Sequence, residues 1–351
     1  YSTADWSVSN PILNPTIVKP SDTSTPTGAR AVFIAAGVYF TIENITLVDG
    51  GWGMFSLTGP GGNVFHSGAS LLVDNVTLDN GYAGYGAGLY SAGGPVMVRG
   101  SRITSGEAIT AGGGIYGVMA VEKTEFSSNV AGRSGAGVHT QGGVLTVTNS
   151  ALLSNAVTSG SGGGIDAQLN ARTTVTATEF ASNSATNGGG INQGSGSLTV
   201  GDSTLHNNIA ANQGAGILAG AGTIVAITNS TLEKNGASGV VGGGLASYGA
   251  RVSLTRTFVL SNAATTGAGL LLAAGINEVV DTVIGANESD GSGAGLWVAD
   301  GATYLTRTAV ANNLAGGNGG GLYVGSNLEP ELLSLRAVTI TENAADGNSG
   351  G

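Results

Sequence analysis

The chain has 351 residues, of which 41% are apolar and 18% (63 residues) are glycine, a composition that excludes a disordered low-complexity tract and argues against two ordinary globular domains. A net charge of −10 with only three lysines argues against binding nucleic acid or an anionic membrane by neutralising phosphates. The absence of cysteine excludes disulfides, thiolate zinc sites and cysteine nucleophiles.

The first 30 residues differ from the rest of the chain. They are polar and punctuated by proline, which predicts an extended N-terminal lead-in or linker over residues 1–30 that could lie across the first coil. No apolar run approaches the roughly 20 residues of a membrane-spanning helix, so we expect no transmembrane segment in this chain. The prolines of the lead-in are Pro11, Pro15, Pro20 and Pro26.

The next two segments differ in length from each other and from the later repeats. Residues 31–50 contain a β-branched and aromatic stretch that predicts the first coil of a repeat. Residues 51–70 are longer than a single turn requires. We therefore expect them to form a surface loop that carries Trp52, Phe55 and Phe65.

A glycine motif recurs through the remainder of the chain. It reads Gly-[Gly/Ala]-Gly followed by an aliphatic residue, and the 233 residues from Leu89 to Leu322 cover nine intervals, a mean of about 26. Repetition at a fixed period of this size indicates a solenoid of stacked units. The aliphatic positions are Leu89, Ile115, Val138, Ile165, Ile191, Ile217, Leu245, Leu270, Leu296 and Leu322.

An asparagine motif alternates with the glycine motif at the same period. It consists of an aliphatic or aromatic residue, two variable positions and then Asn. We expect these asparagines to stack at a turn, because Asn tolerates unusual backbone angles and its amide can bond to the amide one coil away. The predicted ladder is Asn129, Asn155, Asn183, Asn208, Asn235, Asn262, Asn287, Asn313 and Asn343.

Short alternating segments lie between the asparagine motifs. In Val144-Leu-Thr-Val-Thr, period-two alternation predicts that Leu145 and Val147 point inward, while Thr146 and Thr148 point outward. Each unit then offers three short strands. One unit cannot bury its apolar face alone, whereas parallel stacking about 4.8 Å apart does bury it.

These features predict an all-β fold, a right-handed parallel β-helix over residues 31–351 with about 11–12 coils of roughly 26 residues. The final Gly350-Gly351 resembles the start of another repeat, so we expect the β-helix to continue or to be capped beyond residue 351. Unpaired strand edges at the ends of such a solenoid need a cap or a partner, and copies of the chain stacked end to end would provide one.

The two motifs together resemble the repeats of the polymorphic outer membrane protein family, over roughly residues 70–351. The family's literal Phe-x-x-Asn form occurs at Phe126–Asn129 and Phe180–Asn183, whereas other copies replace Phe with Leu, Val or Ile. The absence of cysteine also departs from the family pattern. The resemblance implies a secreted β-helical passenger or surface protein, often an adhesin, located outside the cell or at its surface.

The residues directly after each glycine motif form one outward column, and this column suggests a face that binds glycans. Its aromatic side chains would stack on sugar rings, and its polar side chains would supply hydrogen bonds. The competing interpretation is an ordinary solvated sheet face with incidental polar residues. The candidate glycan-facing residues are Tyr116, His139, Asp166, Asn192, Trp297 and Tyr323, joined by Gln141 and Gln168 two positions further along.

No catalytic cluster stands out in the sequence. A pair of catalytic carboxylates requires two acids within roughly 5–10 Å, and Asp166 has no acidic neighbour one coil away in its column. An interrupted column of threonines that includes Thr148 and Thr176 allows an ice-binding face as a further alternative. The neighbouring Glu278 and Tyr304 argue against that alternative, because a surface that matches ice should be flat and regular.

Metal and cofactor sites are equally hard to identify. The histidines His66, His139 and His206 are about 70 residues apart and occupy different phases of the repeat, so we expect no metal site from them. Asp290 and Asp346, with nearby Asn and Gly residues, leave a weak possibility of calcium in turns. We expect no other cofactor.

The sequence therefore favours a non-enzymatic extracellular or cell-surface β-helix protein with a structural or adhesive role, such as an adhesin stalk, a passenger domain or a surface filament subunit. Its partners would be a host or neighbouring cell surface, glycans or copies of itself, and not nucleic acid. The alternative is a β-helix that binds or degrades polysaccharides, with a pectate-lyase-like lyase or hydrolase activity.

Overall fold

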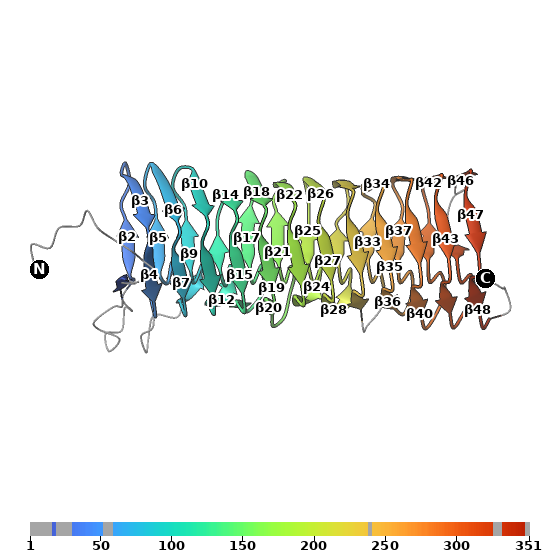
Figure 1. Cartoon of the computed structure of the whole chain (residues 1–351), viewed down its shortest axis with the longest axis horizontal. Helices are drawn as coiled ribbons and strands as arrows, with labels where there is room; N and C mark the ends of the chain where they lie inside the picture. The colour runs from blue at the N-terminus through green and yellow to red at the C-terminus, as the bar shows by residue number, and fades with distance from the viewer. Residues whose placement is uncertain (1–15, 19–29, 52–58, 238–240, 326–331, 348–351) are drawn as a thin grey trace, which may run out of the picture.

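The computed structural model describes residues 16–18, 30–51, 59–237, 241–325 and 332–347. These residues form a rod made only of short strands and turns, in which each strand pairs in parallel with its counterpart one coil away (Figure 1). The described ranges contain no helix long and apolar enough to cross a membrane. The predicted parallel β-helix with a repeat of roughly 26 residues is confirmed.

The strands that follow the glycine motif form the first sheet of each coil, which we call sheet 1. Its 12 described strands pair in chain order. They are β2 (Val32–Ile34), β5 (Val64–His66), β9 (Leu89–Ser91), β13 (Ile115–Tyr116), β17 (Val138–Gln141), β21 (Ile165–Gln168), β25 (Ile191–Gln193), β29 (Ile217–Ala219), β33 (Leu245–Tyr248), β37 (Leu270–Ala273), β41 (Leu296–Ala299) and β45 (Leu322–Val324).

The predicted alternating strands form sheet 2, which lies along the upper edge of the rod in Figure 1 and has 12 described strands. The alternation is as expected, because Leu145 and Val147 are fully buried and Thr146 and Thr148 face outward. The strands are β3 (Tyr39–Glu43), β6 (Ser70–Asp74), β10 (Val96–Arg99), β14 (Ala120–Glu122), β18 (Val144–Thr148), β22 (Arg172–Thr176), β26 (Ser197–Gly201), β30 (Ile224–Thr228), β34 (Arg251–Thr255), β38 (Ile276–Val280), β42 (Ala302–Thr306) and β46 (Leu332–Arg336).

Sheet 3 carries the buried aliphatic or aromatic residue of the asparagine motif and has 13 described strands. Its first strand comes from the expected lead-in, because Thr16–Val18 pairs with β4; most of residues 1–30 lie outside the described residues. The strands are β1 (Thr16–Val18), β4 (Ile45–Val48), β7 (Thr77–Asp79), β11 (Arg102–Thr104), β15 (Glu125–Ser127), β19 (Ala151–Leu153), β23 (Glu179–Ala181), β27 (Thr204–His206), β31 (Thr231–Glu233), β35 (Phe258–Leu260), β39 (Val283–Gly285), β43 (Ala309–Ala311) and β47 (Thr339–Thr341).

Sheet 4 corrects the expectation of three strands per coil, because it adds a fourth set of 11 described strands directly after the asparagines. Most of them have only two residues, too few to show any alternation. They are β8 (Tyr82–Tyr85), β12 (Glu107–Ala111), β16 (Val130–Ala131), β20 (Ala156–Val157), β24 (Ser184–Asn187), β28 (Ile209–Gln213), β32 (Gly236–Ala237), β36 (Ala263–Ala264), β40 (Glu288–Ser289), β44 (Leu314–Ala315) and β48 (Ala344–Ala345).

The surface loop expected over residues 51–70 is wrong for Phe65. Phe65 belongs to β5 and pairs with Tyr90, so it is part of sheet 1. Trp52 and Phe55 lie outside the described residues.

The interior of the rod consists of aliphatic ladders. The aliphatic residues that follow the glycine motif form one of them: Ile115, Val138, Ile165 and Ile191 are fully buried, and successive members pair in register. Each sheet adds comparable inward columns, so every coil covers the apolar residues of its neighbours. Burial of this kind contributes about 25 cal/mol per Å² of apolar surface and is the main force that holds the coils together.

The glycine motif serves two different purposes. Its first glycine has a positive φ, +53° at Gly135 and +72° at Gly162, a conformation that residues with a Cβ rarely adopt. Its third glycine allows neighbouring coils to approach, because a Cβ on Gly164 would lie 2.5 Å from the carbonyl oxygen of Gly190.

Candidate functional site

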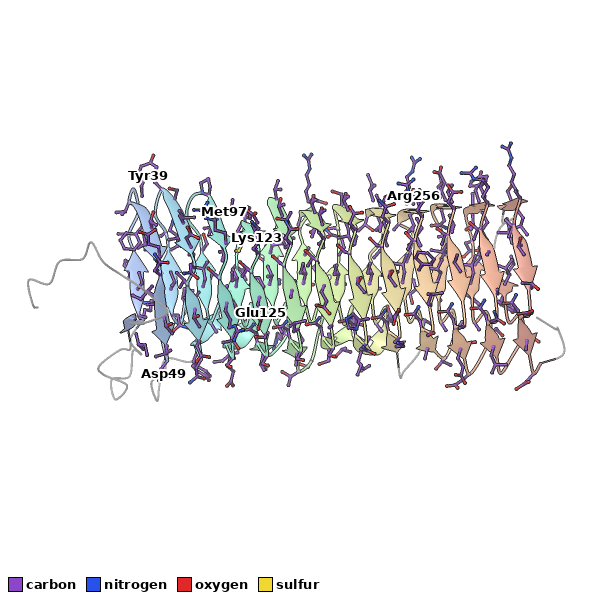
Figure 2. The ribbon with its side chains drawn as sticks, in the orientation of Figure 1. Tyr39, Asp49, Met97, Lys123, Glu125 and Arg256 are labelled. Carbon is purple, nitrogen blue, oxygen red and sulfur yellow. The ribbon has the colours of Figure 1, made fainter. Side chains whose placement is uncertain are left out.

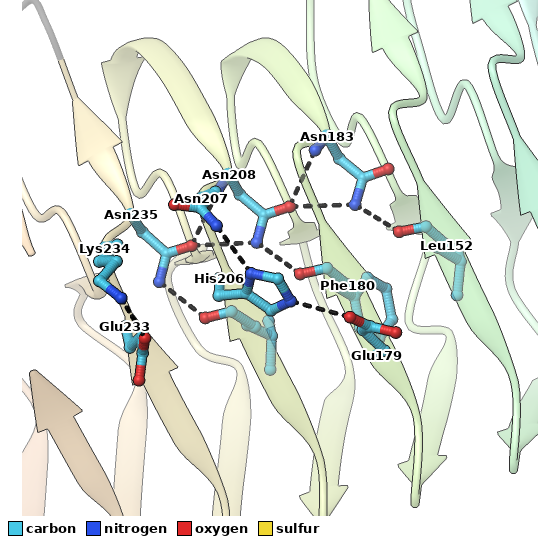
Figure 3. Close-up of polar contacts among 11 residues, drawn as sticks. Leu152, Glu179, Phe180, Asn183, His206, Asn207, Asn208, Glu233, Lys234 and Asn235 are labelled. Atoms are coloured by element: carbon cyan, nitrogen blue, oxygen red, sulfur yellow. Dashed lines mark hydrogen bonds and ion pairs between the residues drawn. The ribbon is translucent and has the colours of Figure 1, made fainter.

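The asparagine corner is a continuous hydrogen-bonded ladder between sheets 3 and 4 (Figure 3). The amide Nδ2 of Asn208 donates to Asn235 Oδ1 at 2.9 Å and to the carbonyl oxygen of Phe180 at 3.0 Å. Its backbone N–H also donates to Asn235 Oδ1, at 3.1 Å. Each such asparagine therefore joins its own coil to the preceding and the following coil.

All nine predicted asparagines take part in this ladder. Eight of them are buried, and Asn343 is the last in the series. The unusual backbone angle falls one residue earlier than the asparagine, for example at Ser154 (φ 54°) before Asn155. The asparagine side chain thus satisfies backbone groups at a corner where the preceding residue makes the bend.

A second polar ladder, which the sequence interpretation missed, lies at the corner between sheets 2 and 3. The backbone N–H of Thr178 donates to Ser203 Oγ at 3.1 Å, and the Thr178 hydroxyl donates to the carbonyl oxygen of Thr176 at 2.9 Å. A serine or threonine stands five residues before each ladder asparagine from Asn129 to Asn313, and this spacing is the signal that would have revealed it. The buried members are Ser101, Thr124, Ser150, Thr178, Ser203, Ser230, Thr257, Thr282 and Thr308.

Part of the proposed glycan-facing column forms a polar cluster around Asp166. Its Oδ1 accepts hydrogen bonds from Asn192 Nδ2 at 2.6 Å and from Gln168 Nε2 at 2.8 Å. His139 Nδ1 lies 2.9 Å from the other carboxylate oxygen but is not aligned for a hydrogen bond, so this contact is an ion pair only when the imidazole is protonated. His139 Nε2 is buried without a hydrogen-bond partner.

The cluster is not exposed as the sequence interpretation required. The exposed fractions of His139, Asp166 and Asn192 are 3%, 1% and 5%. The first glycine of each motif covers the column: a Cβ on Gly135 would lie 2.7 Å from His139 Cβ. These three side chains therefore cannot contact a glycan in this conformation. Of the other candidate residues, Gln141 is exposed, whereas Gln168, Tyr116, Trp297 and Tyr323 are half-buried.

The aromatic members of the column stack on one another. The ring centroids of Tyr90 and Tyr116 are 5.1 Å apart at 19°, and Tyr116 contacts the His139 ring at 4.9 Å. Tyr90 stacks on Phe65, which in turn stacks on Phe33. Neighbours therefore cover both faces of the Tyr116 ring, and the expected stacking of a sugar on that face is not available.

Trp297 and Tyr323 form a separate pair in the same column. Their ring centroids lie 6.3 Å apart and nearly parallel, at 17°. Leu271 occupies the position next to Trp297 one coil earlier and is buried. The polar cluster and this aromatic pair are thus more than one hundred residues apart in the chain, and no continuous exposed aromatic surface joins them.

The remaining histidines and acids do not converge on a metal site. His66 is fully buried beside Ser91 Oγ, 3.0 Å from Nδ1, and burial lowers its pKa. His206 Nε2 lies 2.9 Å from Glu179 Oε1 at the surface (Figure 3). The described ranges hold no group of three or more His, Cys, Asp or Glu residues suited to a metal ion.

The two candidate calcium ligands stand two coils apart. Asp290 and Asp346 each follow the short strand of sheet 4 in their coil, and Gly316 occupies the matching position between them. Coils are about 4.8 Å apart, so the separation is about 9.6 Å along the axis. Among the residues that the structure describes, neither carboxylate belongs to a group of three or more His, Cys, Asp or Glu residues that could hold an ion.

The threonine column on sheet 2 has the register that the sequence predicts. Thr148 pairs with Thr176, and Gly201 and Val280 interrupt the column further along. The adjacent column contains Glu278 beside Tyr304. The face is uneven, which argues against an ice-binding role.

The fold and its two polar ladders define the class of this protein as a parallel β-helix held together by stacked side chains. No protein-family model, no curated protein and no solved structure matches the chain.

Proposed function

We propose that this protein is a non-enzymatic β-helix with a structural or adhesive role outside the cell or at its surface, as an adhesin stalk, a passenger domain or a surface filament subunit. The observation that carries the proposal is the uninterrupted asparagine ladder from Asn129 to Asn343. Its amides are bonded between coils and are not presented to a ligand. A rod of this kind displays a long surface while every coil supports its neighbours.

The resemblance to the repeats of polymorphic outer membrane proteins supports the same proposal. The resemblance concerns the glycine and asparagine motifs, and these are the residues that build the corners of the rod. Proteins with such repeats are surface or passenger proteins, often adhesins. The proposed partners are accordingly a host or neighbouring cell surface, its glycans, or further copies of the chain.

The polysaccharide-degrading alternative has less support. Its candidate residues Asp166 and His139 are covered, and the oxygens of Asp166 already contact Asn192, Gln168 and His139. A general acid or base must come within hydrogen-bond reach of the proton that it transfers. A robust lyase or hydrolase activity that disappears in Asp166→Asn would overturn the non-enzymatic proposal.

Retention of protein-coated beads on cells under flow tests the adhesive role. Beads coated with this chain should stay on host or bacterial cell layers at least several-fold longer than beads coated with albumin. Analytical ultracentrifugation of the chain alone tests the filament role, which predicts end-to-end oligomers. Absence of both retention and oligomers would contradict the proposal.

A further inference from the structure

One coil is shorter than its neighbours, and the shortening falls in a single turn. The interval from Ile115 to Val138 is 23 residues, whereas the other eight intervals of the glycine motif are 25 to 28. Strand register places the shortening between sheets 1 and 2. Three positions separate Tyr116 from Met119, whereas six separate the matching residues in the coil on either side.

The short turn leaves a hollow between two longer turns. Residues 92–95 form one wall, Gln141 and Val144 form the other, and residues 117–119 form the floor. The hollow has a volume of about 710 Å³, within the range of about 300–1,000 Å³ that is usual for ligand sites. The short turn of residues 117–119 is therefore recessed between the longer turns of the two neighbouring coils.

The hollow continues toward the N-terminal end of the rod. A second hollow of about 460 Å³ shares Pro95, Val96 and Ala120 with the first. It extends past Met97 to Tyr39, which lie on the same side of the rod (Figure 2). Together the two hollows form a trough along the outer face of sheet 2, which has room for a chain of several units.

The trough has no charged side chain. None of the residues that line either hollow is Asp, Glu, Lys, Arg or His. The protein as a whole carries a net charge of −10, which repels polyanions such as uronates. A charged ligand would lose hydration here without gaining a partner, so the trough fits an uncharged ligand.

The lining combines aliphatic surface with hydrogen-bonding groups. Val118 and Val144 are 41% and 52% exposed, and Pro95 and Met119 complete the aliphatic surface of the first hollow. The exposed amide of Gln141 can both donate and accept. The Tyr116 phenol, whose ordinary pKa of about 10 keeps it protonated at neutral pH, can donate, and burial raises that pKa further. Neutral sugars present the same mixture of C–H surface and hydroxyl groups.

We propose that this trough, from Tyr39 to Val144, is a binding site for a neutral oligosaccharide chain, which is the ligand of the adhesive function proposed above. The sugar lies against Pro95, Val118 and Val144, and Gln141 bonds to its hydroxyl groups. The site differs from the outward column of sheet 1, whose aromatic faces are covered. The biological role of this site rests on the proposed adhesive function. Its ability to bind a saccharide does not.

Isothermal titration calorimetry with neutral hexasaccharides of glucose, mannose, galactose and xylose tests the site. We expect at least one to bind with a Kd of about 1 mM or tighter, and hexagalacturonate to bind at least tenfold more weakly. Insertion of Gly-Ser-Gly between Val118 and Met119 restores the turn length of the neighbouring coils and fills the hollow. We expect this insertion to weaken binding at least tenfold.

Two matched controls separate loss of the site from loss of the fold. The same insertion between Ala221 and Gly222, in the equivalent turn of another coil, should leave binding within twofold of wild type. Val144→Asp should abolish binding, whereas Ile224→Asp, in the same outward column three coils away, should not. Absence of binding by every neutral hexasaccharide, or equal binding by the Val118 insertion variant, would overturn the site.

The bead assay distinguishes failure of the site from failure of the adhesive function. Beads that still adhere when coated with the Val118 insertion variant would show that adhesion uses another surface, and the trough proposal would be wrong. Wild-type beads that fail to adhere, with saccharide binding intact, would contradict only the adhesive function. If calorimetry detects binding of an apolar peptide but of no saccharide, the proposed ligand is wrong and the trough is a peptide site.

Discussion

The corner between sheets 3 and 4 has the same length in coil after coil, whereas the turn between sheets 1 and 2 does not. Five positions separate the buried residue of sheet 3 from that of sheet 4, as in Phe126 to Ala131 and Leu152 to Val157. The turns between sheets 1 and 2 vary from three positions after Tyr116 to ten after Tyr323. The corner of constant length contains the buried asparagine ladder, and the turn of variable length forms the trough.

The difference follows from what each corner must satisfy. At the asparagine corner, buried backbone groups depend on a side chain from the next coil, so an inserted residue would leave several of them unpaired. The turn between sheets 1 and 2 reaches solvent, where water can satisfy the backbone. This edge can therefore change shape between coils, and a binding surface can arise there at little cost to stability.

Equal insertions at the two places should give the largest contrast. Gly-Ser-Gly between Ser154 and Asn155 moves Asn155 out of the ladder, and we expect it to destabilise the chain by more than about 4 kcal/mol. The same insertion between Val118 and Met119 should change stability by less than about 1 kcal/mol. Urea unfolding followed by circular dichroism measures both, and equal effects would break the comparison.

Removal of one ladder amide should have the next largest effect. Asn208→Ala leaves the carbonyl oxygen of Phe180 and the backbone and side-chain N–H groups of Asn183 without their partner. We expect a loss of about 3–5 kcal/mol in the free energy of unfolding, because each buried unpaired group costs about 1–3 kcal/mol. The exposed amide variant Gln141→Ala should lose less than about 0.5 kcal/mol. Similar losses in the two variants would argue against a structural ladder.

Buried His66 should make stability depend on pH. Burial lowers its folded-state pKa below the unfolded value of about 6.5, so the unfolded chain takes up a proton first. Stability should be complete above about pH 6.5 and fall as the pH drops from there toward the folded-state pKa. His66→Gln should flatten this part of the curve, and the surface variant His206→Gln should not. A decline that is unchanged in His66→Gln would show that another group causes it.

The surface pair of Asp281 and Arg307 should have the smallest effect. Arg307 donates to both carboxylate oxygens of Asp281, at 2.6 Å and 2.9 Å, and this hydrogen bonding lowers the pKa of Asp281. The contribution should be present above the unfolded pKa of about 3.9 and disappear as the pH falls through the folded value. Asp281→Asn should match wild type at low pH and be slightly less stable near neutral pH. A larger difference at low pH would contradict the assignment.

Most of the fold could be predicted because a solenoid repeats the same requirements in each coil. The aliphatic residue after the glycines, and the asparagine three positions after a buried apolar residue, are visible as letters at a fixed period. Sheet 4 could not be predicted from alternation, because strands such as Val130–Ala131 have only two residues. The serine and threonine ladder was visible in the sequence and was overlooked.

The candidate site was harder to predict than the fold. The sequence pattern predicts that His139 and Asp166 point outward, but it does not show that the preceding glycines pack against them and that both side chains are buried. The trough, by contrast, left a trace in the sequence as the interval of 23 residues between Ile115 and Val138.

Engineered disulfides test the central claim, the in-register stacking of adjacent coils, most directly, because the chain has no cysteine of its own. Thr146 pairs with Thr174 one coil away, and Thr174 pairs with Thr199 in the coil after that. Adjacent coils are about 4.8 Å apart, within the Cα separation of about 4.4–6.8 Å that a disulfide requires. Thr146→Cys with Thr174→Cys should form a disulfide quantitatively on oxidation, and Thr146→Cys with Thr199→Cys should not. A bond in the second pair, or none in the first, would contradict the stacked register.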